Sequence, residues 1–267
     1  MLGVPFEGPR WALILGVSSG FGASTARALA AEGWNIAGVH LDRRATLHHA
    51  HQVQADVEAA GCKALFFNTN AADADKRAMV CDTLAETMAA DGGKVMCLMH
   101  SLAFGSLLPF VATEGKSVTR KQMDMTLDVM ANSLVYWTQD LMTREMMASG
   151  GRVFAMTSTG ARQVSPSYGV VSAAKSALES HCRQLAFELL PLGITVNAIC
   201  AGVTKTAALL KIPGHEVLME KSMSKSPLKR LTQTEDVAGA IVALCDPRLY
   251  WMTGNVLGIH GGEEIIG

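Results

Sequence analysis

Residues 16–22 read Gly16-Val17-Ser18-Ser19-Gly20-Phe21-Gly22, a stretch with three glycines and two serines. An apolar run, residues 11–15, precedes it, and an alanine-rich segment, residues 23–31, follows it. Glycines between a strand and a helix permit a tight turn and a close approach of the backbone to a ligand. Amides at the helix N-terminus then point at a phosphate, to which Ser18 and Ser19 add hydroxyl donors. The stretch predicts a dinucleotide-binding turn, with an ordinary strand-to-helix turn as the alternative.

Short apolar runs recur along the chain, with longer amphipathic segments between them. Bulky, nearly unbroken apolar runs are typical of strands buried on both faces, and gaps of roughly 15–30 residues leave room for helical crossovers. The pattern predicts an α/β fold, namely a Rossmann-type doubly wound parallel sheet of about seven strands with helices on both faces. The predicted strands are residues 11–15, 36–39, 64–67, 95–100, 153–157, 194–200 and 256–260.

The length of the chain favours one undivided unit. Its 267 residues, 49% of them hydrophobic, can bury a large core, so residues 1–267 are expected to form a single domain. Residues 203–230 interrupt the rhythm of strands and helices with two prolines and five lysines. We predict that this segment is a flap over a site.

Composition excludes several classes of partner. The formal net charge is −1 and charged residues make up 18% of the chain, so nucleic acid and anionic membranes are not expected partners, and a small molecule is favoured. The six cysteines form no Cys-x-x-Cys pair, and residues 1–10 hold no long apolar stretch, which favours a cytoplasmic location. His48, His49 and His51 share a predicted helix, but no cysteine or carboxylate completes a site, and no metal is expected.

The spacing Gly-x-x-x-Gly-x-Gly resembles the glycine turn of the short-chain dehydrogenase/reductases. Further matches are Asn132 in a long central helix, the run Val196-Asn197-Ala198, and the pairs Thr253-Gly254 and Gly261-Gly262. The resemblance runs nearly end to end. It implies an oxidoreductase that uses a nicotinamide dinucleotide.

The family's tyrosine is displaced in this chain. Most members place it four residues before the lysine, but here that position is Val171, and Tyr168 lies seven residues before Lys175, while Ser158 keeps the family's serine position. A ketone reductase needs its acid beside the carbonyl that receives hydride. In an enoyl thioester, hydride goes to the β-carbon and charge develops on the more distant thioester oxygen. A tyrosine three helical residues earlier, about 4.5 Å along the axis, suits enoyl reduction.

The Tyr168-to-Lys175 spacing and the run His100-Ser101-Leu102-Ala103-Phe104 resemble the enoyl-acyl-carrier-protein reductases. The ordinary glycine turn, and Ser158 in place of that group's outer tyrosine, indicate a variant subgroup. The resemblance implies reduction of the α,β double bond of an enoyl thioester with hydride from NAD(P)H. Tyr168 would stabilise the enolate oxygen, Lys175 would hold the nicotinamide ribose, and Asn132 could bind the water of a proton relay. The alternatives are carbonyl reduction by Ser158 and Tyr168, or a non-catalytic scaffold that senses the cofactor.

Cofactor choice depends on the end of the second predicted strand. The family's ribose-binding acidic residue falls at His40, and Arg43-Arg44 could hold a 2′-phosphate, which favours NADP. A shift of two residues would make Asp42 the ribose ligand and favour NAD. Asn70 matches the adenine contact. The resemblance implies further cofactor contacts at Gly16, Ser18, Ser19, Gly20, Phe21, Gly22, Ser101, Leu102, Ala103, Lys175, Gly202, Val203, Thr204 and Thr206.

The same resemblance describes the substrate. An acyl thioester, carried by acyl carrier protein or coenzyme A, would lie against Phe104 and Tyr168, in fatty acid biosynthesis or a related pathway of lipid metabolism. Met219 and Met223 are one helical turn apart in the flap and could line an acyl-chain channel. The flap lysines could meet an acidic carrier, although a solvated loop also explains them. A homotetramer is expected from the family alone, through the helices that contain Asn132 and Tyr168.

Overall fold

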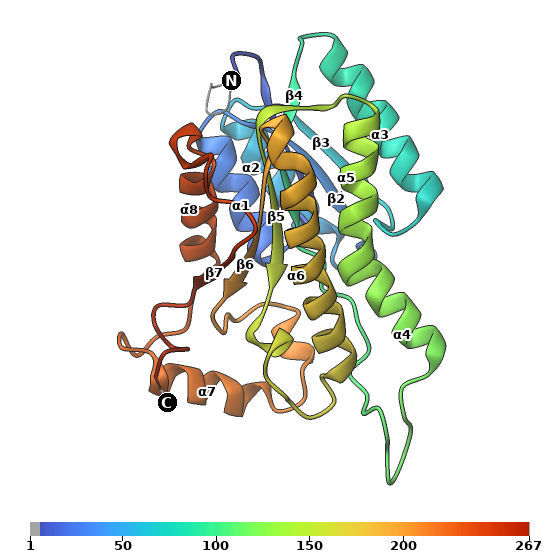
Figure 1. Ribbon diagram of the computed structural model, residues 1–267, viewed down its shortest axis with the longest axis vertical. Helices are drawn as coiled ribbons and strands as arrows, with labels where there is room; N and C mark the ends of the chain where they lie inside the picture. The colour runs from blue at the N-terminus through green and yellow to red at the C-terminus, as the bar shows by residue number, and fades with distance from the viewer. Residues whose placement is uncertain (1–5, 267) are drawn as a thin grey trace.

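The computed structural model describes residues 6–266 and places seven parallel strands in one sheet, in the order β3-β2-β1-β4-β5-β6-β7 (Figure 1). The predicted doubly wound sheet is therefore confirmed. All seven predicted strands are present, although β5 begins six residues earlier than expected. The strands are β1 (Arg10–Leu15), β2 (Asn35–His40), β3 (Ala64–Asn68), β4 (Lys94–His100), β5 (Met147–Thr157), β6 (Thr195–Ala201) and β7 (Val256–Ile259).

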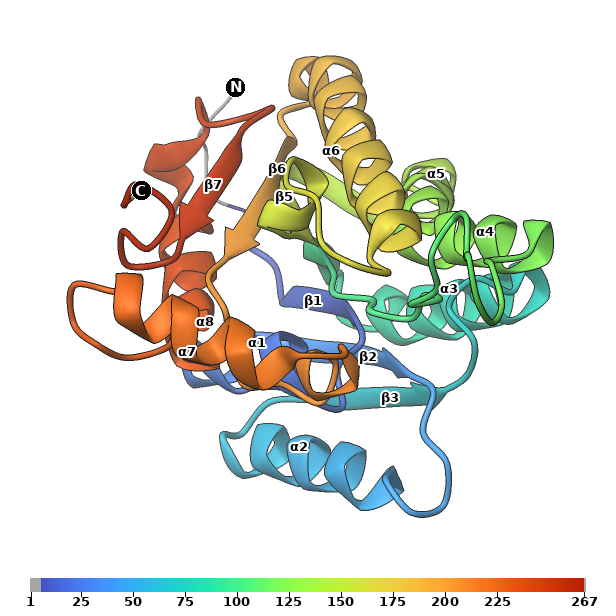
Figure 2. The same cartoon turned by 90° about the horizontal axis from the view of Figure 1, so that it is seen from below.

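Helices cover both faces of the sheet, as Figure 2 shows from below. One face carries α1 (Gly20–Ala31), α2 (Leu47–Ala59) and α8 (Thr234–Leu244). The other carries α3 (Ala74–Ala89), α5 (Ser133–Thr143) and α6 (Gly169–Leu189). Helix α4 (Arg120–Leu127) runs into α5 through one π-helical turn (Asp128–Asn132). No helix within residues 6–266 is long and apolar enough to cross a bilayer.

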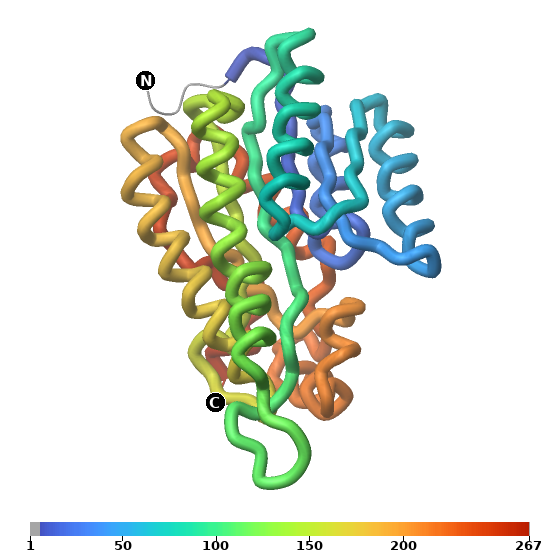
Figure 3. Tube along the Cα trace, turned by 90° about the vertical axis from the view of Figure 1, so that its right-hand side faces the viewer, coloured from blue at the N-terminus to red at the C-terminus, as the bar shows by residue number. Residues whose placement is uncertain are grey.

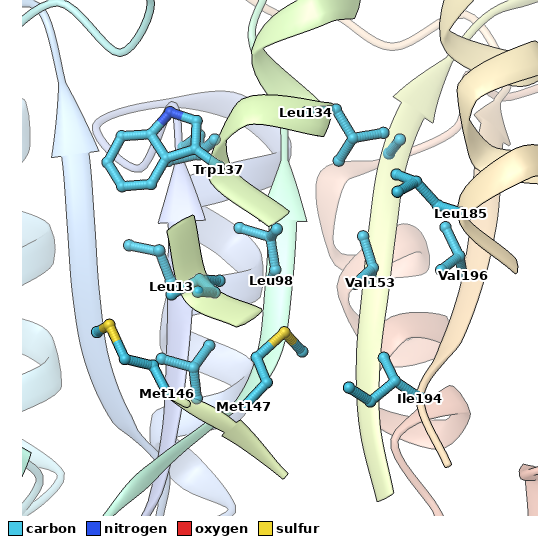
Figure 4. Close-up of a cluster of buried hydrophobic side chains, with 14 of the residues drawn as sticks. Leu13, Leu98, Leu134, Trp137, Met146, Met147, Val153, Leu185, Ile194 and Val196 are labelled. Carbon is cyan, nitrogen blue, oxygen red and sulfur yellow. The ribbon is translucent and has the colours of Figure 1, made fainter. Parts of the chain in front are cut away.

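Strand β1 explains why the predicted strands read as unbroken apolar runs. Leu13 and Leu15 point into one buried cluster, together with Trp137 of α5, as seen around Leu13 in Figure 4. Ala12 and Ile14 point into the opposite cluster. Because helices cover both faces, the alternation between apolar and polar side chains that marks a half-exposed strand is absent.

Two long connections extend beyond the carboxyl edge of the sheet. Residues 101–119, between β4 and α4, contain no helix or strand and run beside α4 to a turn at the end of the molecule (Figure 3). The predicted flap, residues 203–230, contains helix α7 (His215–Lys225), which lies across the lower end of the molecule in Figure 1. These connections border the edge where β1, β4, β5 and β6 end.

Candidate active site

The site lies where the order of strands reverses, between β1 and β4. In open parallel sheets, the crevice at such a point is the usual place for a ligand. The glycine turn follows β1 there, and a Cβ on Gly16 would lie 2.5 Å from the Ser101 carbonyl oxygen. The turn and the loop after β4 are therefore in direct contact.

The glycine turn fits a pyrophosphate. Gly16 and Gly20 have φ values of 91° and 54°, which L side chains rarely adopt. A Cβ on Gly22 would lie 2.1 Å from the Gly16 carbonyl oxygen, so the turn closes only with glycine there. Ser19 is the N-cap of α1, and its side chain makes no capping hydrogen bond. The first turn of α1 has no acidic residue. Amides at this end of the helix are available to an anion.

The loop after β6 borders the same turn. A Cβ on Gly20 would lie 3.4 Å from Cγ2 of Thr206, which places residues of this loop against the pyrophosphate position. The Gly202 amide donates to the Ile259 carbonyl at 3.0 Å, and the Thr204 hydroxyl donates to the Gly202 carbonyl at 3.0 Å. Two segments that are distant in sequence thus meet at the predicted cofactor site.

Asp42 and His40 form a pair at the end of β2. The His40 ring is buried, with Nδ1 2.9 Å from Asp42 Oδ2, and burial lowers its pKa. A contact between His40 and the ribose stays a prediction, and in this structure the ring is instead paired with Asp42. The ring lies against the Asp42 carboxylate, which belongs to the segment just after β2, and His40 is 6% exposed. Burial raises the pKa of Asp42, but hydrogen bonds from Thr46, Ser18 and His40 outweigh this effect, and the net shift is downward.

Asn68, which the sequence analysis missed, fixes the backbone of Asp42. Its Oδ1 accepts from the Asp42 amide at 2.9 Å, and its Nδ2 donates to the Asp42 carbonyl at 3.0 Å. The available signal was an asparagine at the end of a predicted strand. Arg43 and Arg44 are exposed, and Oδ1 of the exposed Asn70 accepts from the Ala72 amide at 3.1 Å. Asp42, rather than the two arginines, is thus the charged group held beside Ser18.

Tyr168 lies next to Ser158, with 3.5 Å between the two hydroxyl oxygens. Tyr168 is the N-cap of α6, which begins at Gly169, and its carbonyl accepts from the Ser172 amide at 2.8 Å, so it stands at the start of the helix. Its ring packs so closely on Gly160 that a Cβ there would lie 2.4 Å from Cε1. Val171, at the family's usual tyrosine position, is buried in an apolar cluster with Val129. Burial raises the pKa of Tyr168 and the Ser158 hydroxyl opposes that shift.

Lys175 is buried behind this pair. Its Nζ donates to the Met156 carbonyl of β5 at 2.7 Å and makes a longer contact, 3.5 Å, with the Leu102 carbonyl. Burial lowers its pKa to about 8. His100 is also buried, and burial, followed by the charge of Lys175, lowers its pKa to about 3. The histidine is neutral at pH 7, so Lys175 carries the positive charge of the site.

This titration gives a first prediction. We expect kcat/KM to fall as the pH rises through about 8, because Lys175 is charged below its lowered pKa and neutral above it. Tyr168 does not titrate over this pH range, because its pKa is raised from an ordinary value of about 10. The profile is measured between pH 6 and 9.5 at constant ionic strength. Lys175→Arg keeps its charge and should give a flat profile, whereas a flat profile for the unaltered enzyme contradicts this assignment.

Other predicted site residues lie elsewhere. Asn132 ends the π-helical turn, and its Oδ1 is 3.1 Å from Nε2 of His181 on α6. Its Oδ1 thus links two helices, and its role in holding a relay water stays a prediction. Phe104 is 55% exposed on the loop after β4. Met219 is half-buried and Met223 exposed on α7.

A family model described as enoyl-(acyl carrier protein) reductase matches residues 16–264 of the chain. The chain belongs to this family. It is an enoyl-acyl-carrier-protein reductase-like member of the short-chain dehydrogenase/reductase superfamily. The matched residues include the glycine turn, Ser158, Tyr168, Lys175 and the loop after β6.

One relative is the enoyl-acyl-carrier-protein reductase (NADH) FabI of Aquifex aeolicus, which is 32% identical to this chain over 177 residues. That alignment covers 66% of this chain but 64% of the relative, so the chain spans less than two thirds of that relative's length. The solved Aquifex aeolicus enzyme, enoyl-acyl-carrier-protein reductase (NADH), superposes with a TM-score of 0.80 at 26% identity, covering 98% of both chains.

A carbonyl-reducing neighbour superposes equally well. LugOII, a promiscuous reductase that catalyses keto-reduction at C1 during lugdunomycin biosynthesis, has a TM-score of 0.82 at 27% identity, covering 96% of this chain and 98% of its own. Backbone similarity therefore does not separate the two reactions within this family. The positions of Ser158, Tyr168 and Lys175 are the features that bear on the choice between enoyl and carbonyl reduction.

Proposed function

We propose that this chain reduces the α,β double bond of an enoyl thioester. The observation that carries the proposal is the position of Tyr168, which precedes the first residue of α6, while Val171 in the usual position is buried among apolar side chains. A hydroxyl placed before the helix suits an oxygen that lies beyond the carbon receiving hydride. FabI of Aquifex aeolicus, which shares this family, carries the name of that reaction.

The proposed mechanism assigns one role to each residue. A bound nicotinamide dinucleotide supplies the hydride. The amides at the start of α1 and the glycine turn bind its pyrophosphate, and Lys175 binds the nicotinamide ribose. The Tyr168 hydroxyl donates a hydrogen bond to the thioester oxygen as negative charge develops there, and the buried charge of Lys175 stabilises that negative charge. The enolate then takes a proton from water at the α-carbon, which completes the reduction. Ser158 lies 3.5 Å from the phenol oxygen, from which it can orient the hydroxyl.

Carbonyl reduction is the second candidate, and the contact between Ser158 and Tyr168 favours it, because a paired serine and tyrosine can polarise a ketone. The test uses crotonyl and acetoacetyl thioesters with the same reduced cofactor, followed at the nicotinamide absorbance. Turnover of the crotonyl thioester alone or in large excess supports the proposal. Turnover restricted to acetoacetyl thioester replaces it with carbonyl reduction.

We infer NADH as the cofactor, which reverses the NADP preference that Arg43-Arg44 favoured in the sequence. Asn68 holds the Asp42 backbone, and the Asp42 carboxylate, whose pKa is lowered by hydrogen bonds from Thr46, Ser18 and His40, supports this inference. A carboxylate at the ribose accepts from the 2′- and 3′-hydroxyls but repels a 2′-phosphate. The name of the Aquifex aeolicus relative, which specifies NADH, agrees.

Replacement of Asp42 tests cofactor choice. We expect Asp42→Ala to raise KM for NADH by about tenfold and to lower KM for NADPH, because a hydrogen-bond acceptor and a like-charge repulsion are both lost. KM is measured for both cofactors with a fixed thioester. Arg44→Ala serves as the control and should change neither value by more than about twofold. A tenfold rise in KM for NADPH in that control would instead support NADP.

The carrier and the assembly are further parts of the proposal. The flap places exposed Lys205, Lys211 and Lys221 around α7, and such charges favour an acidic carrier protein over free coenzyme A. Comparison of kcat/KM for crotonyl groups on the two carriers, at low and high salt, tests this choice. We also propose a cytoplasmic homotetramer that serves fatty acid biosynthesis, and sedimentation velocity tests the assembly.

A further inference from the structure

A buried carboxylate outside the proposed catalytic group joins helix α7 of the flap to residues 202–206, the first part of the loop after β6, which we call the cofactor loop. Glu263 follows β7 and is 8% exposed. One of its oxygens, Oε1, accepts from the Val203 amide at 2.9 Å. The other, Oε2, accepts from the Ser222 hydroxyl in a short hydrogen bond. Val203 belongs to the loop after β6, and Ser222 is the buried residue of α7, so one side chain spans both segments.

The segment around Glu263 makes further contacts with the flap and with the cofactor loop. Lys225, at the end of α7, donates to the Ile266 carbonyl at 3.0 Å. A Cβ on Gly262 would lie 3.7 Å from Cγ of Pro227, which is ordinary contact. A Cβ on Gly202 would lie 3.1 Å from Oε1 of Glu263, so the cofactor loop approaches the carboxylate closely. In Figure 1 the end of the chain lies beside α7.

Packing alone does not explain a carboxylate at this position. A buried charge loses its hydration, and an apolar side chain of similar size would fill the space without that penalty. What a carboxylate supplies is two acceptors about 2.2 Å apart that hold two donors from different segments at once. Both oxygens of Glu263 are used in that way.

We propose that Glu263 is a positioning residue that couples the flap helix to the cofactor loop. Residues 202–206 lie against the glycine turn through Thr206, so a cofactor that orders this loop also fixes the Val203 amide. Glu263 passes that order to Ser222 and holds α7 over the substrate side of the site. Cofactor binding therefore organises the flap before the enoyl thioester binds. The kinetic part of this inference rests on the proposed function, whereas the binding part does not.

Three variants separate coupling from simple packing. Glu263→Gln keeps an oxygen for the Val203 amide and an NH₂ that can donate to Ser222, so it should stay within about twofold of the unaltered protein in every measurement. Glu263→Leu removes both acceptors and should weaken NADH binding by tenfold or more. Ser222→Ala removes only the flap bond, so it should raise KM for the thioester severalfold and weaken NADH binding by less than Glu263→Leu does, by about threefold at most.

A readout without turnover completes the test. Trypsin cleavage at Lys211 and Lys221 is followed with and without NADH, and the Kd for NADH is measured by fluorescence. We expect NADH to protect the flap in the unaltered protein and in Glu263→Gln, but not in Ser222→Ala. If NADH protects the flap of Ser222→Ala as well as that of the unaltered protein, and KM for the thioester is unchanged, the proposed coupling is wrong. This result stands even if Glu263→Leu fails to fold. If NADH fails to protect Ser222→Ala and the unaltered protein reduces no enoyl thioester, the coupling is supported and the proposed function is rejected.

Discussion

Replacement of Tyr168 by phenylalanine is expected to lower kcat for enoyl reduction by about 10²–10³-fold, while the Kd for NADH changes by less than about twofold. The phenylalanine keeps the ring on Gly160, so packing survives. It removes the hydroxyl that donates to the developing enolate. Loss of one such donor costs roughly 3–4 kcal/mol of transition-state stabilisation. Single-turnover rates at saturating NADH measure the effect on the chemical step.

Two variants bracket this result. Tyr250→Phe loses the same hydroxyl from a residue near β7, outside the site, and should retain full activity. Ser158→Ala should lose less than Tyr168→Phe, since Ser158 acts on the substrate only through the phenol in enoyl reduction. An equal or larger loss in Ser158→Ala would favour the carbonyl mechanism, in which the serine touches the substrate. Full activity of Tyr168→Phe would remove Tyr168 from the mechanism.

Replacement of Gly22 by alanine is expected to lower the free energy of unfolding by about 3 kcal/mol and to abolish measurable NADH binding. The new methyl group would meet the Gly16 carbonyl oxygen at 2.1 Å and the Gly16 carbonyl carbon at 2.9 Å. Both are backbone atoms of the turn that holds the pyrophosphate. Relief therefore requires the turn to open, which moves the amides away from the phosphate. Urea unfolding and NADH titration measure the two effects.

Gly239→Ala is the matched control. Gly239 also lies within a helix, α8, which packs on α1, but nothing lies within 4 Å of a Cβ placed there. Alanine should raise the free energy of unfolding by up to about 1 kcal/mol, because glycine is the poorer helix former. Unchanged NADH affinity in Gly22→Ala would contradict the assignment of this turn to the pyrophosphate.

Features close together in the sequence were predicted well. The glycine turn and the apolar runs gave the sheet, because period and turn chemistry reflect local sterics and two-sided burial. The displacement of Tyr168 from the usual position was also legible. The sequence did not predict that Tyr168 is the N-cap of α6, because a helix boundary depends on which backbone hydrogen bonds form.

Cofactor recognition at the end of β2 depends on contacts between distant residues. His40 and Asp42 are two residues apart, and the sequence does not say which is buried. Strand pairing decides it, since β2 places His40 opposite Asn68 of β3, and Asn68 then holds the Asp42 backbone. That contact depends on the register between strands.

The doubly wound sheet, the dinucleotide turn at Gly16 to Gly22 and the family of the chain all follow from its residues read in order. Three contacts follow only from the folded chain: Asp42 with Ser18, Asn132 with His181, and Glu263 with both Val203 and Ser222. The physical reason is the range of the interactions. Turns and apolar periods are set by neighbouring residues, whereas a hydrogen bond between distant segments exists only after packing has brought its donor and acceptor together.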